Sequence, residues 1–149
     1  MIRFENVRKK GSLNNVAFTI ESGRTCVLSE HENDASAILA LACGITVPDT
    51  GKVTSDQSVR FVAENAPIPR YLTVSQYFDT VKTITGTSKA PKITEEIEAE
   101  YGKDVIGALD DLDRYYVALS AAIIGSPVAI AVSDPFHGVP YEHREKLNA

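Results

Sequence analysis

The sequence predicts an α/β fold in which buried parallel strands lie beside an antiparallel edge. Residues 1–8 and 16–20 alternate apolar and polar side chains, which is typical of strands with one buried face. Residues 25–28 and 128–132 are apolar throughout, which is typical of strands covered on both faces. Helical spacing of apolar side chains, clearest in residues 114–124, separates these strands.

The first part of the chain is predicted to form a hairpin, a buried strand and a helix. A turn at residues 9–12 joins the two alternating strands. Cys26, inside the apolar run, is expected to be a small buried side chain. A helix rich in Ala and Leu follows at residues 35–43, with Asn33 or Asp34 as its N-cap.

The middle of the chain is predicted to hold two strands and a capped helix. The strands are residues 52–54 and 59–63. Thr73 can cap a helix over residues 74–82. One apolar face of this helix is formed by Tyr77, Phe78 and Val81.

The remainder is predicted to be mostly helical. Residues 83–93 are typical of a flexible connection, and residues 94–100 open an acidic helix with a solvated face. Helix is predicted again over residues 105–112 and 114–124. A short polar helix is expected at residues 141–148.

The composition is that of an acidic globular protein. Its 149 residues include 15 Lys and Arg against 20 Asp and Glu, so the formal net charge is −5. This balance argues against general nucleic-acid binding, which needs clustered cations. No apolar run approaches the roughly 18–20 residues that cross a bilayer, and the first residues do not resemble a signal peptide. We expect one cytoplasmic domain with two free cysteines.

Neither a metal site nor acid–base catalysis is predicted. His31, Glu32, Asp134, His137 and His143 are residue types that suit zinc. No two of the histidines have the i, i+4 spacing of one helical face. The pair Asp134 and His137 has no accompanying nucleophile with an orienting group.

Several stretches of the chain follow, in order, the framework of one known family. They are residues 2–7, 13–23, 40–53, 61–64 with 71–74, 114–124 with 126–127, and 134–138. Together they resemble the ATP-binding (nucleotide-binding) domain of ATP-binding cassette (ABC) transporters, in the P-loop NTPase superfamily. This resemblance implies a mixed sheet with an antiparallel N-terminal edge, a reduced helical subdomain and a truncated C-terminal part.

The resemblance divides the predicted single domain, residues 1–149, into four parts. Residues 1–28 would hold the antiparallel edge and the first core strand, and residues 29–63 would hold the phosphate loop with its helix and strands. Residues 64–112 would form the reduced helical region. Residues 113–149 would contain the signature helix, a Walker B-like strand and a terminal helix. Glu64 would stand at the Q-loop position.

The phosphate loop of that family, G-x-x-x-x-G-K-[ST], is altered in this chain. Its glycines let backbone N–H groups face the phosphates, its lysine neutralises them, and its last residue holds Mg²⁺. In register, Ser29 and Asp34 replace the glycines and Ala35 replaces the lysine. Only Ser36 keeps the expected residue type.

Three carboxylates, on Glu30, Glu32 and Asp34, stand where a polyphosphate would lie. At about 4 Å each repulsion is worth about 1 kcal/mol in water and about 4 kcal/mol at the effective dielectric of a protein surface. We therefore expect nucleotide held in the usual way to bind very weakly.

Other nucleotide-contacting positions of the family also differ. Ser133 stands at the position of the metal-holding aspartate, and Asp134 at that of the catalytic glutamate. Residues 109–113 replace the signature motif, whose glycines present N–H groups to a partner's phosphate. Lys10 lies near the expected adenine-stacking aromatic residue.

A partner groove is implied after the Q-loop region, where the family receives the coupling helix of a permease. Tyr71, Tyr77 and Phe78 would line it. Ordinary packing of these side chains against the sheet is the alternative.

The chain keeps the hydrophobic framework of the family and lacks the residues of its catalytic positions, which predicts a pseudo-ATPase. Such a chain would be a structural or regulatory subunit of an ABC transporter-like complex. It would need no cofactor and would not hydrolyse ATP by itself. Its partners would be an intact ABC ATPase subunit, a permease or a second copy, with membrane contact at the inner face through a permease. The alternative is a divergent ATP-binding subunit, in which Ser36 and Asp134 use ATP and Mg²⁺ in a composite site with another chain. A third alternative is a module whose acidic loop, residues 29–34, binds a cationic ligand.

Overall fold

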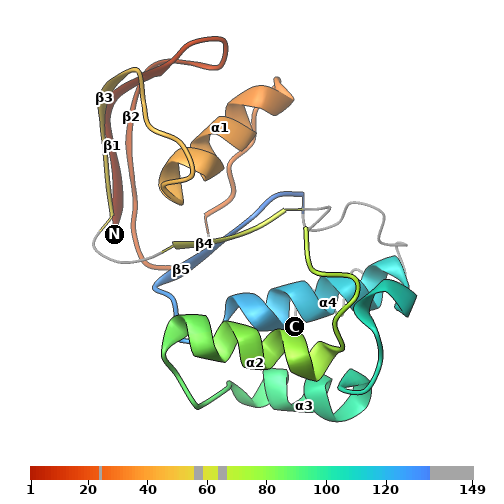
Figure 1. Cartoon of the computed structure of the whole chain (residues 1–149). Helices are drawn as coiled ribbons and strands as arrows, with labels where there is room; N and C mark the ends of the chain where they lie inside the picture. Colours follow the sequence, from red (N-terminus) through yellow and green to blue (C-terminus); the bar gives the residue numbers. More distant parts are fainter. Residues whose placement is uncertain (24, 56–58, 64–66, 135–149) are drawn as a thin grey trace. The chain divides into compact units, whose positions relative to one another are not determined.

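The chain forms two units, and each is described here by itself. The computed structural model describes residues 1–23, 25–55, 59–63 and 67–134. It divides into Met1–Phe61 and Val62–Ala149 (Figure 1). The single domain expected over residues 1–149 stays a prediction.

The first unit contains a three-stranded antiparallel sheet and one helix. The strands are β1 (Ile2–Lys9), β2 (Leu13–Ile20) and β3 (Thr50–Ser55), in the order β2-β1-β3. The helix is α1 (Glu32–Ala42). Because β1 and β2 pair antiparallel, the predicted hairpin is confirmed.

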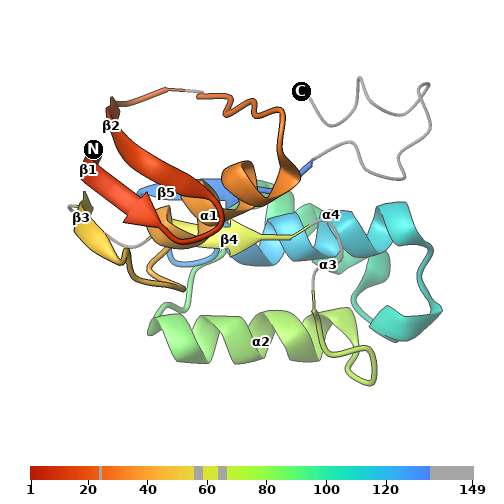
Figure 2. The same cartoon turned by 90° about the horizontal axis from the view of Figure 1, so that it is seen from above.

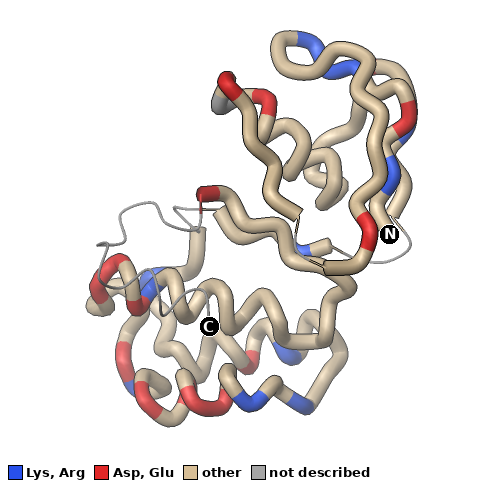
Figure 3. The backbone as a smooth tube through the Cα atoms, turned by 180° about the vertical axis from the view of Figure 1, so that it is seen from behind, with Lys and Arg blue, Asp and Glu red and all other residues tan. Residues whose placement is uncertain are grey.

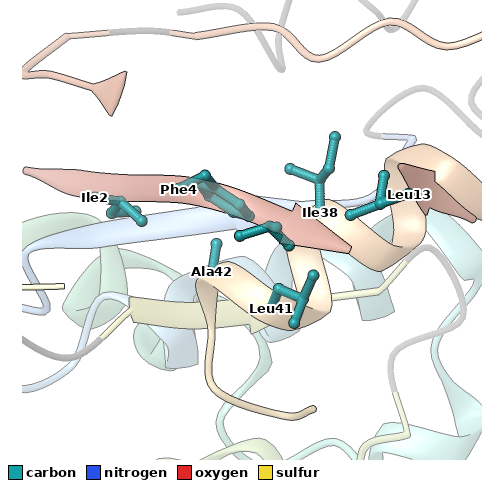
Figure 4. Packing of buried hydrophobic residues seen from close by; sticks show 7 residues of the cluster. Ile2, Phe4, Leu13, Ile38, Leu41 and Ala42 are labelled. Carbon is teal, nitrogen blue, oxygen red and sulfur yellow. The ribbon is translucent and has the colours of Figure 1, made fainter. Parts of the chain in front are cut away.

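The core of this unit lies between the sheet and α1. Alternation along β1 points Ile2 and Phe4 toward the helix. The buried cluster is Ile2, Phe4, Val7, Leu13, Ile38, Leu41 and Ala42 (Figure 4). Phe4 also stacks on Phe18 of β2, with ring centroids 4.5 Å apart. The apolar face of α1, which follows a 3.6-residue period, therefore packs against the apolar face of β1, which follows a 2-residue period.

A bulge interrupts β1 at Asn6, whose backbone is left-handed with φ of 49°. The register of β1 shifts at this point against both β2 and β3. Gly51 of β3, with φ of 84°, lies against the bulge, and a Cβ atom there would overlap the Asn6 carbonyl oxygen. Position 51 therefore requires glycine.

Two predictions for residues 25–28 are wrong. This segment has no partner strand among the described residues, and Leu28 is 89% exposed. Cys26 is exposed rather than buried. An apolar run becomes a buried strand only where neighbouring elements cover it, and local composition does not contain that information.

The predicted N-cap of the first helix is also wrong. Helix α1 begins at Glu32, so its N-cap is His31, which makes no side-chain capping hydrogen bond. Asn33 and Asp34 therefore lie inside the first turn, where Asp34 accepts a hydrogen bond from a residue that precedes the helix.

The second unit contains three helices that contact one another. They are α2 (Val74–Thr85), α3 (Lys92–Tyr101) and α4 (Asp111–Ala122) (Figure 2). The buried cluster between them is Val74, Phe78, Ile106, Val117, Ala121 and Ile124. The Thr94 hydroxyl, fully buried, donates to the Ser120 carbonyl oxygen at 3.0 Å and ties α3 to α4.

Strands β4 (Val59–Val62) and β5 (Ala129–Val132), both predicted as strands, pair with each other in a two-stranded sheet. The Ser133 N–H donates to the Val62 carbonyl oxygen at 3.0 Å. All four residues of β5 are half-buried rather than fully covered. Helix α4 packs here through Tyr115, Ala118 and Ala122, which form a cluster with Val62.

Helix α2 starts as its sequence predicts. The Thr73 hydroxyl accepts the Gln76 N–H at 3.3 Å, and the Gln76 side chain accepts the Thr73 N–H at 3.0 Å. This reciprocal capping box satisfies two otherwise unpaired donors. Gly86, with φ of 66°, ends the helix.

The helix predicted over residues 105–112 is wrong. Residues 106–108 form one turn of 3-10 helix, η1 (Ile106–Ala108), and α-helix starts only at Asp111, as the first residue of α4. A longer helix does not form, because backbone N–H groups of this turn bond to a distant segment. The Ile106 N–H donates to the Leu72 carbonyl oxygen, and the Gly107 N–H donates to the Arg70 carbonyl oxygen.

The connection predicted over residues 83–93 is shorter than expected, because α2 runs to Thr85 and α3 starts at Lys92. The terminal helix predicted over residues 141–148 lies outside the described residues. In the described part of the chain, every helix is too short or too polar to span a bilayer.

Candidate functional site

The segment at the phosphate-loop position leads directly into α1. Ser29 and Ser36 are exposed, whereas Asp34 and Ala35 are half-buried. Because α1 begins at Glu32, the last part of the segment is the first turn of the helix. Backbone N–H groups at a helix N-terminus have no intrahelical partner, so this is where an anion could be held.

Ser29 closes this segment on itself. Its hydroxyl donates to the Asp34 carboxylate at 3.3 Å and accepts the His31 N–H at 3.2 Å. The Asp34 N–H donates to the His31 carbonyl oxygen at 3.0 Å. We call this set of three hydrogen bonds the Ser29 latch. It joins Ser29 and Asp34, the two residues that the resemblance aligns with the loop glycines, and it engages the backbone N–H groups of His31 and Asp34.

The electrostatics of the segment favour a helix without a bound anion. No Lys or Arg occurs between residues 25 and 51. Asp34 lies in the first turn of α1, where a negative charge interacts favourably with the helix dipole. The chain therefore supplies its own anionic group at this helix start.

The segment at the signature position caps α4 in a similar way. The Asp110 carboxylate accepts the Asp113 N–H at 2.8 Å. The Arg114 guanidinium donates to the Leu109 carbonyl oxygen at 2.6 Å and lies 3.2 Å from the Asp111 carboxylate. Acidic residues thus gather in the sequence at the start of α4, where the tube of Figure 3 is red.

The carboxylate of Asp113 also makes a hydrogen bond within this unit. It accepts the Tyr101 hydroxyl at 3.1 Å, which joins the end of α3 to the start of α4. Burial, and then the negative charge of Asp113, raise the pKa of Tyr101 above its ordinary range. Asp110 and Asp113 therefore make hydrogen bonds that stabilise this unit.

Asp134 lies two residues after the end of β5 and has a left-handed backbone, with φ of 34°, and an exposed side chain. Tyr115 of α4 lies nearby in the fold. Burial, and then the charge of Asp134, raise the pKa of Tyr115 to about 12. The Tyr115 hydroxyl is buried and has no hydrogen-bond partner in the described part of the chain. Ser133, at the metal-holding position, is half-buried.

The three residues of the expected partner groove differ in exposure. Tyr71 is 80% exposed, Tyr77 is half-buried, and Phe78 is fully buried. Phe78 belongs to the core between the helices, against which Tyr77 also packs. Among the three, only Tyr71 leaves most of its side chain exposed to solvent.

Solved structures resemble this arrangement, although no protein-family model and no curated protein matches the chain. One is an inward-facing ABC transporter assigned to the metal-chelate type, with a TM-score of 0.80, 19% identity and 98% of this chain covered. A second, with a TM-score of 0.79, 17% identity and 99% coverage, is a dimeric ATP-binding cassette in a post-hydrolysis state bound to ADP and Pi. A third is cbiO1 from Clostridium perfringens, part of the transporter complex cbiONQ, with a TM-score of 0.76, 14% identity and 98% coverage.

The chain has the fold of an ABC transporter ATP-binding cassette. The predicted α/β class and antiparallel N-terminal edge are confirmed. The chain spans 64% of the first of these structures, 79% of the dimeric cassette and 70% of cbiO1. At these low identities the likeness establishes the cassette fold, and the activity of the chain is a separate question.

Some sequence-predicted positions of the cassette cannot be placed. Glu64, at the Q-loop position, and the histidines His137 and His143 lie outside the described residues. In the residues that are described, no three His, Cys, Asp or Glu side chains gather as a metal site would require. Lys10, near the expected aromatic position, is exposed, and its N–H donates to Asp49.

Sequence reasoning missed two residues of this cassette fold. Arg114 holds the signature segment through Leu109, and Tyr115 carries the unpaired hydroxyl. The signal for Tyr115 was available, because Tyr115, Ala118 and Ala122 are spaced i, i+3, i+7 and mark a buried face. The Arg114 contact depends on the path of the preceding loop and had no local signal.

Proposed function

We propose that this chain is a pseudo-ATPase, a non-catalytic structural or regulatory subunit of an ABC transporter-like complex. The observation that carries the proposal is the Ser29 latch. In a working phosphate loop the equivalent N–H groups face phosphate oxygens. Here the His31 N–H is bound to Ser29, a carboxylate occupies the second glycine position, and Ala35 provides no cation. The residues present therefore do not fit a triphosphate held in the usual way.

The signature segment supports the same proposal. A partner's phosphate would have to approach the start of α4, where Asp110 already accepts the Asp113 N–H. The exposed carboxylates of Asp110 and Asp111 would repel it. Two separate helix starts thus carry the chain's own acidic groups, and no ATP or Mg²⁺ is needed to stabilise either.

The proposed partners are an intact ABC ATPase subunit, a permease or a second copy. The structural relatives include a dimeric cassette and a cassette that is part of a transporter complex. We propose that this chain acts in the cytoplasm, peripheral to the inner face of the membrane, and reaches the membrane through a permease. Tyr71, which is 80% exposed, is the residue of the expected groove that a permease would contact.

A thermal-shift titration with Mg-ATP tests the proposal. A ligand at about 100 times its Kd stabilises a protein by about 2.7 kcal/mol, so micromolar binding would raise Tm clearly at millimolar ATP. We expect the Tm of this chain to stay constant. A saturable rise in Tm would contradict the proposal.

A restored loop provides the matched positive control. The triple variant Ser29→Gly, Asp34→Gly and Ala35→Lys completes the pattern G-x-x-x-x-G-K-S, because Ser36 is already present. It removes the latch and supplies the missing cation, so Mg-ATP should raise its Tm. If the variant folds and also fails to respond, the latch is not what excludes nucleotide.

The second candidate function is a divergent ATP-binding subunit with a composite site. It is favoured by Ser36, which keeps the Mg²⁺-holding residue type and is exposed on α1. Asp134 would contribute from the end of β5. Isothermal titration with Mg-ATP in the presence of an intact cassette partner separates the two functions, because only the composite site would add a second binding event per heterodimer.

A further inference from the structure

The turn of the β1–β2 hairpin is basic, although the chain is acidic overall. Arg8 and Lys10 are exposed there, and Lys9 is half-buried (Figure 3). Among the contacts of the described residues, Asp49 is the carboxylate that meets this turn: it accepts the Lys10 N–H at 2.6 Å and lies 3.7 Å from the Lys9 ammonium. These contacts, the Lys10 N–H first, hold the pKa of Asp49 below its usual range. Three cations against one carboxylate leave the turn with a charge of 3 − 1 = +2.

The loop that follows α1 is fixed against this turn. The Lys9 ammonium donates to the Val47 carbonyl oxygen at 2.8 Å, and the Asp49 N–H donates to the Arg8 carbonyl oxygen at 2.9 Å. The loop exposes two aliphatic side chains, with Val47 at 73% and Ile45 at 62%. We call Arg8, Lys10, Ile45 and Val47 the tip patch.

We propose that the tip patch binds an anionic lipid surface directly. Lys and Arg near such a surface are attracted by its negative potential, and exposed aliphatic side chains gain by entering the boundary between headgroups and acyl chains. The hairpin turn projects at one end of the first unit (Figure 1). A projecting turn can meet a flat layer of headgroups without a shaped pocket.

The proposal adds a contact to the proposed function and does not depend on nucleotide. Two cations and two aliphatic side chains give weak binding, which assists attachment of a subunit already held by a permease. The exposed carboxylate of Glu30 belongs to the same unit and opposes binding to an anionic surface. Its neutralisation is therefore part of the test.

Co-sedimentation with vesicles is the experiment. The full chain should bind vesicles of phosphatidylcholine and phosphatidylglycerol, and should not bind pure phosphatidylcholine. Lys10→Glu should lower the bound fraction by about fivefold or more, since one cation is worth about 1 kcal/mol near such a surface. Val47→Ser should weaken binding, and Glu30→Gln should strengthen it.

The matched controls lie in the second unit. Lys103→Glu makes the same change of net charge at another exposed lysine, and Ile84→Ser removes another exposed aliphatic side chain. Both should bind like the unchanged chain. Three results would each overturn the proposal. The first is an equal loss of vesicle binding in Lys103→Glu and Lys10→Glu, and the second is binding that does not depend on phosphatidylglycerol. The third is a Lys10→Glu variant that changes only self-association in the absence of vesicles. The Mg-ATP titration is unaffected by any of these results.

Discussion

At the scale of single residues, hydroxyl groups of this chain find hydrogen-bond partners both within their own segment and on neighbouring helices. The Ser29 hydroxyl serves both Asp34 and His31, and the Thr94 hydroxyl reaches the Ser120 carbonyl oxygen. Tyr115 differs, because its buried hydroxyl has no hydrogen-bond partner among the described residues. A buried polar group without a partner costs about 1–3 kcal/mol.

Removing the Tyr115 hydroxyl should therefore stabilise the protein. We expect Tyr115→Phe to raise the free energy of unfolding at pH 7 by about 1 kcal/mol, because the ring still packs while the unpaired group is lost. Urea denaturation measures this. A loss of stability would show that the hydroxyl has a partner that matters.

The Tyr115 side chain should also make the free energy of unfolding depend on pH. The pKa of Tyr115 is raised from 10.0 to about 12, so the fold favours the neutral phenol. This stabilisation is complete below pH 10 and is lost as the pH rises toward 12. Tyr115→Phe should thus lose less stability than the unchanged chain over this alkaline range in the same urea measurements.

At the scale of elements, helix starts determine much of the local structure. Helix α2 is capped by Thr73 and Gln76 reciprocally, and α4 is capped by Asp110. Helix α1 has no side-chain cap at His31 and relies on the preceding latch. The Thr73 cap of α2 was predicted from the sequence, because a capping box is a local motif, whereas Asp110 was expected inside a helix and not at its start.

Removal of the α2 cap should destabilise the second unit. Thr73→Ala leaves the Gln76 N–H without its acceptor and should lower the free energy of unfolding by about 1 kcal/mol. Thr80→Ala is the matched control, because Thr80 is exposed on the same helix and its hydroxyl only returns to the Gln76 carbonyl oxygen. Urea denaturation that gives the two variants equal effects would argue against the capping box.

At the scale of the whole molecule, charge is divided unevenly. The second unit, residues 62–149, contains 13 acidic and 8 basic residues, so its net charge is 8 − 13 = −5. The first unit, residues 1–61, contains 7 of each and is neutral. The excess acidity lies mainly on α3, on the start of α4 and between them (Figure 3).

Salt should therefore affect the two units differently. Repulsion within the second unit is screened over about 8 Å at physiological ionic strength. Hydrogen exchange of α3 and α4 amides should slow as salt is raised, whereas β1 and β3 amides in the neutral unit should change little and serve as the internal control. Faster exchange in α3 and α4 at high salt would mean that ion pairs such as Lys82 with Glu98, 3.2 Å apart, outweigh the repulsion.

The candidate site was predictable in position but not in arrangement. Aligning Ser29 and Asp34 with the two loop glycines located the segment, since a motif is a matter of spacing. The hydrogen bond between these two residues needed the structure, because it depends on where α1 begins. Tyr71 and Phe78 were both assigned to the expected groove, yet packing between helices buries Phe78 and leaves Tyr71 exposed.

The sequence by itself determined the order of the hairpin, of the strands at residues 52–54, 59–63 and 128–132 and of the main helices, together with the net acidity of the chain. These follow from periodicity and composition, which are local or additive properties. The tertiary structure alone decided that Cys26 and Leu28 stay exposed, that the Ile106 N–H donates to the Leu72 carbonyl oxygen, and that the buried Tyr115 hydroxyl has no hydrogen-bond partner among the described residues. Burial and pairing join residues distant in the chain, so they arise only when the elements are packed.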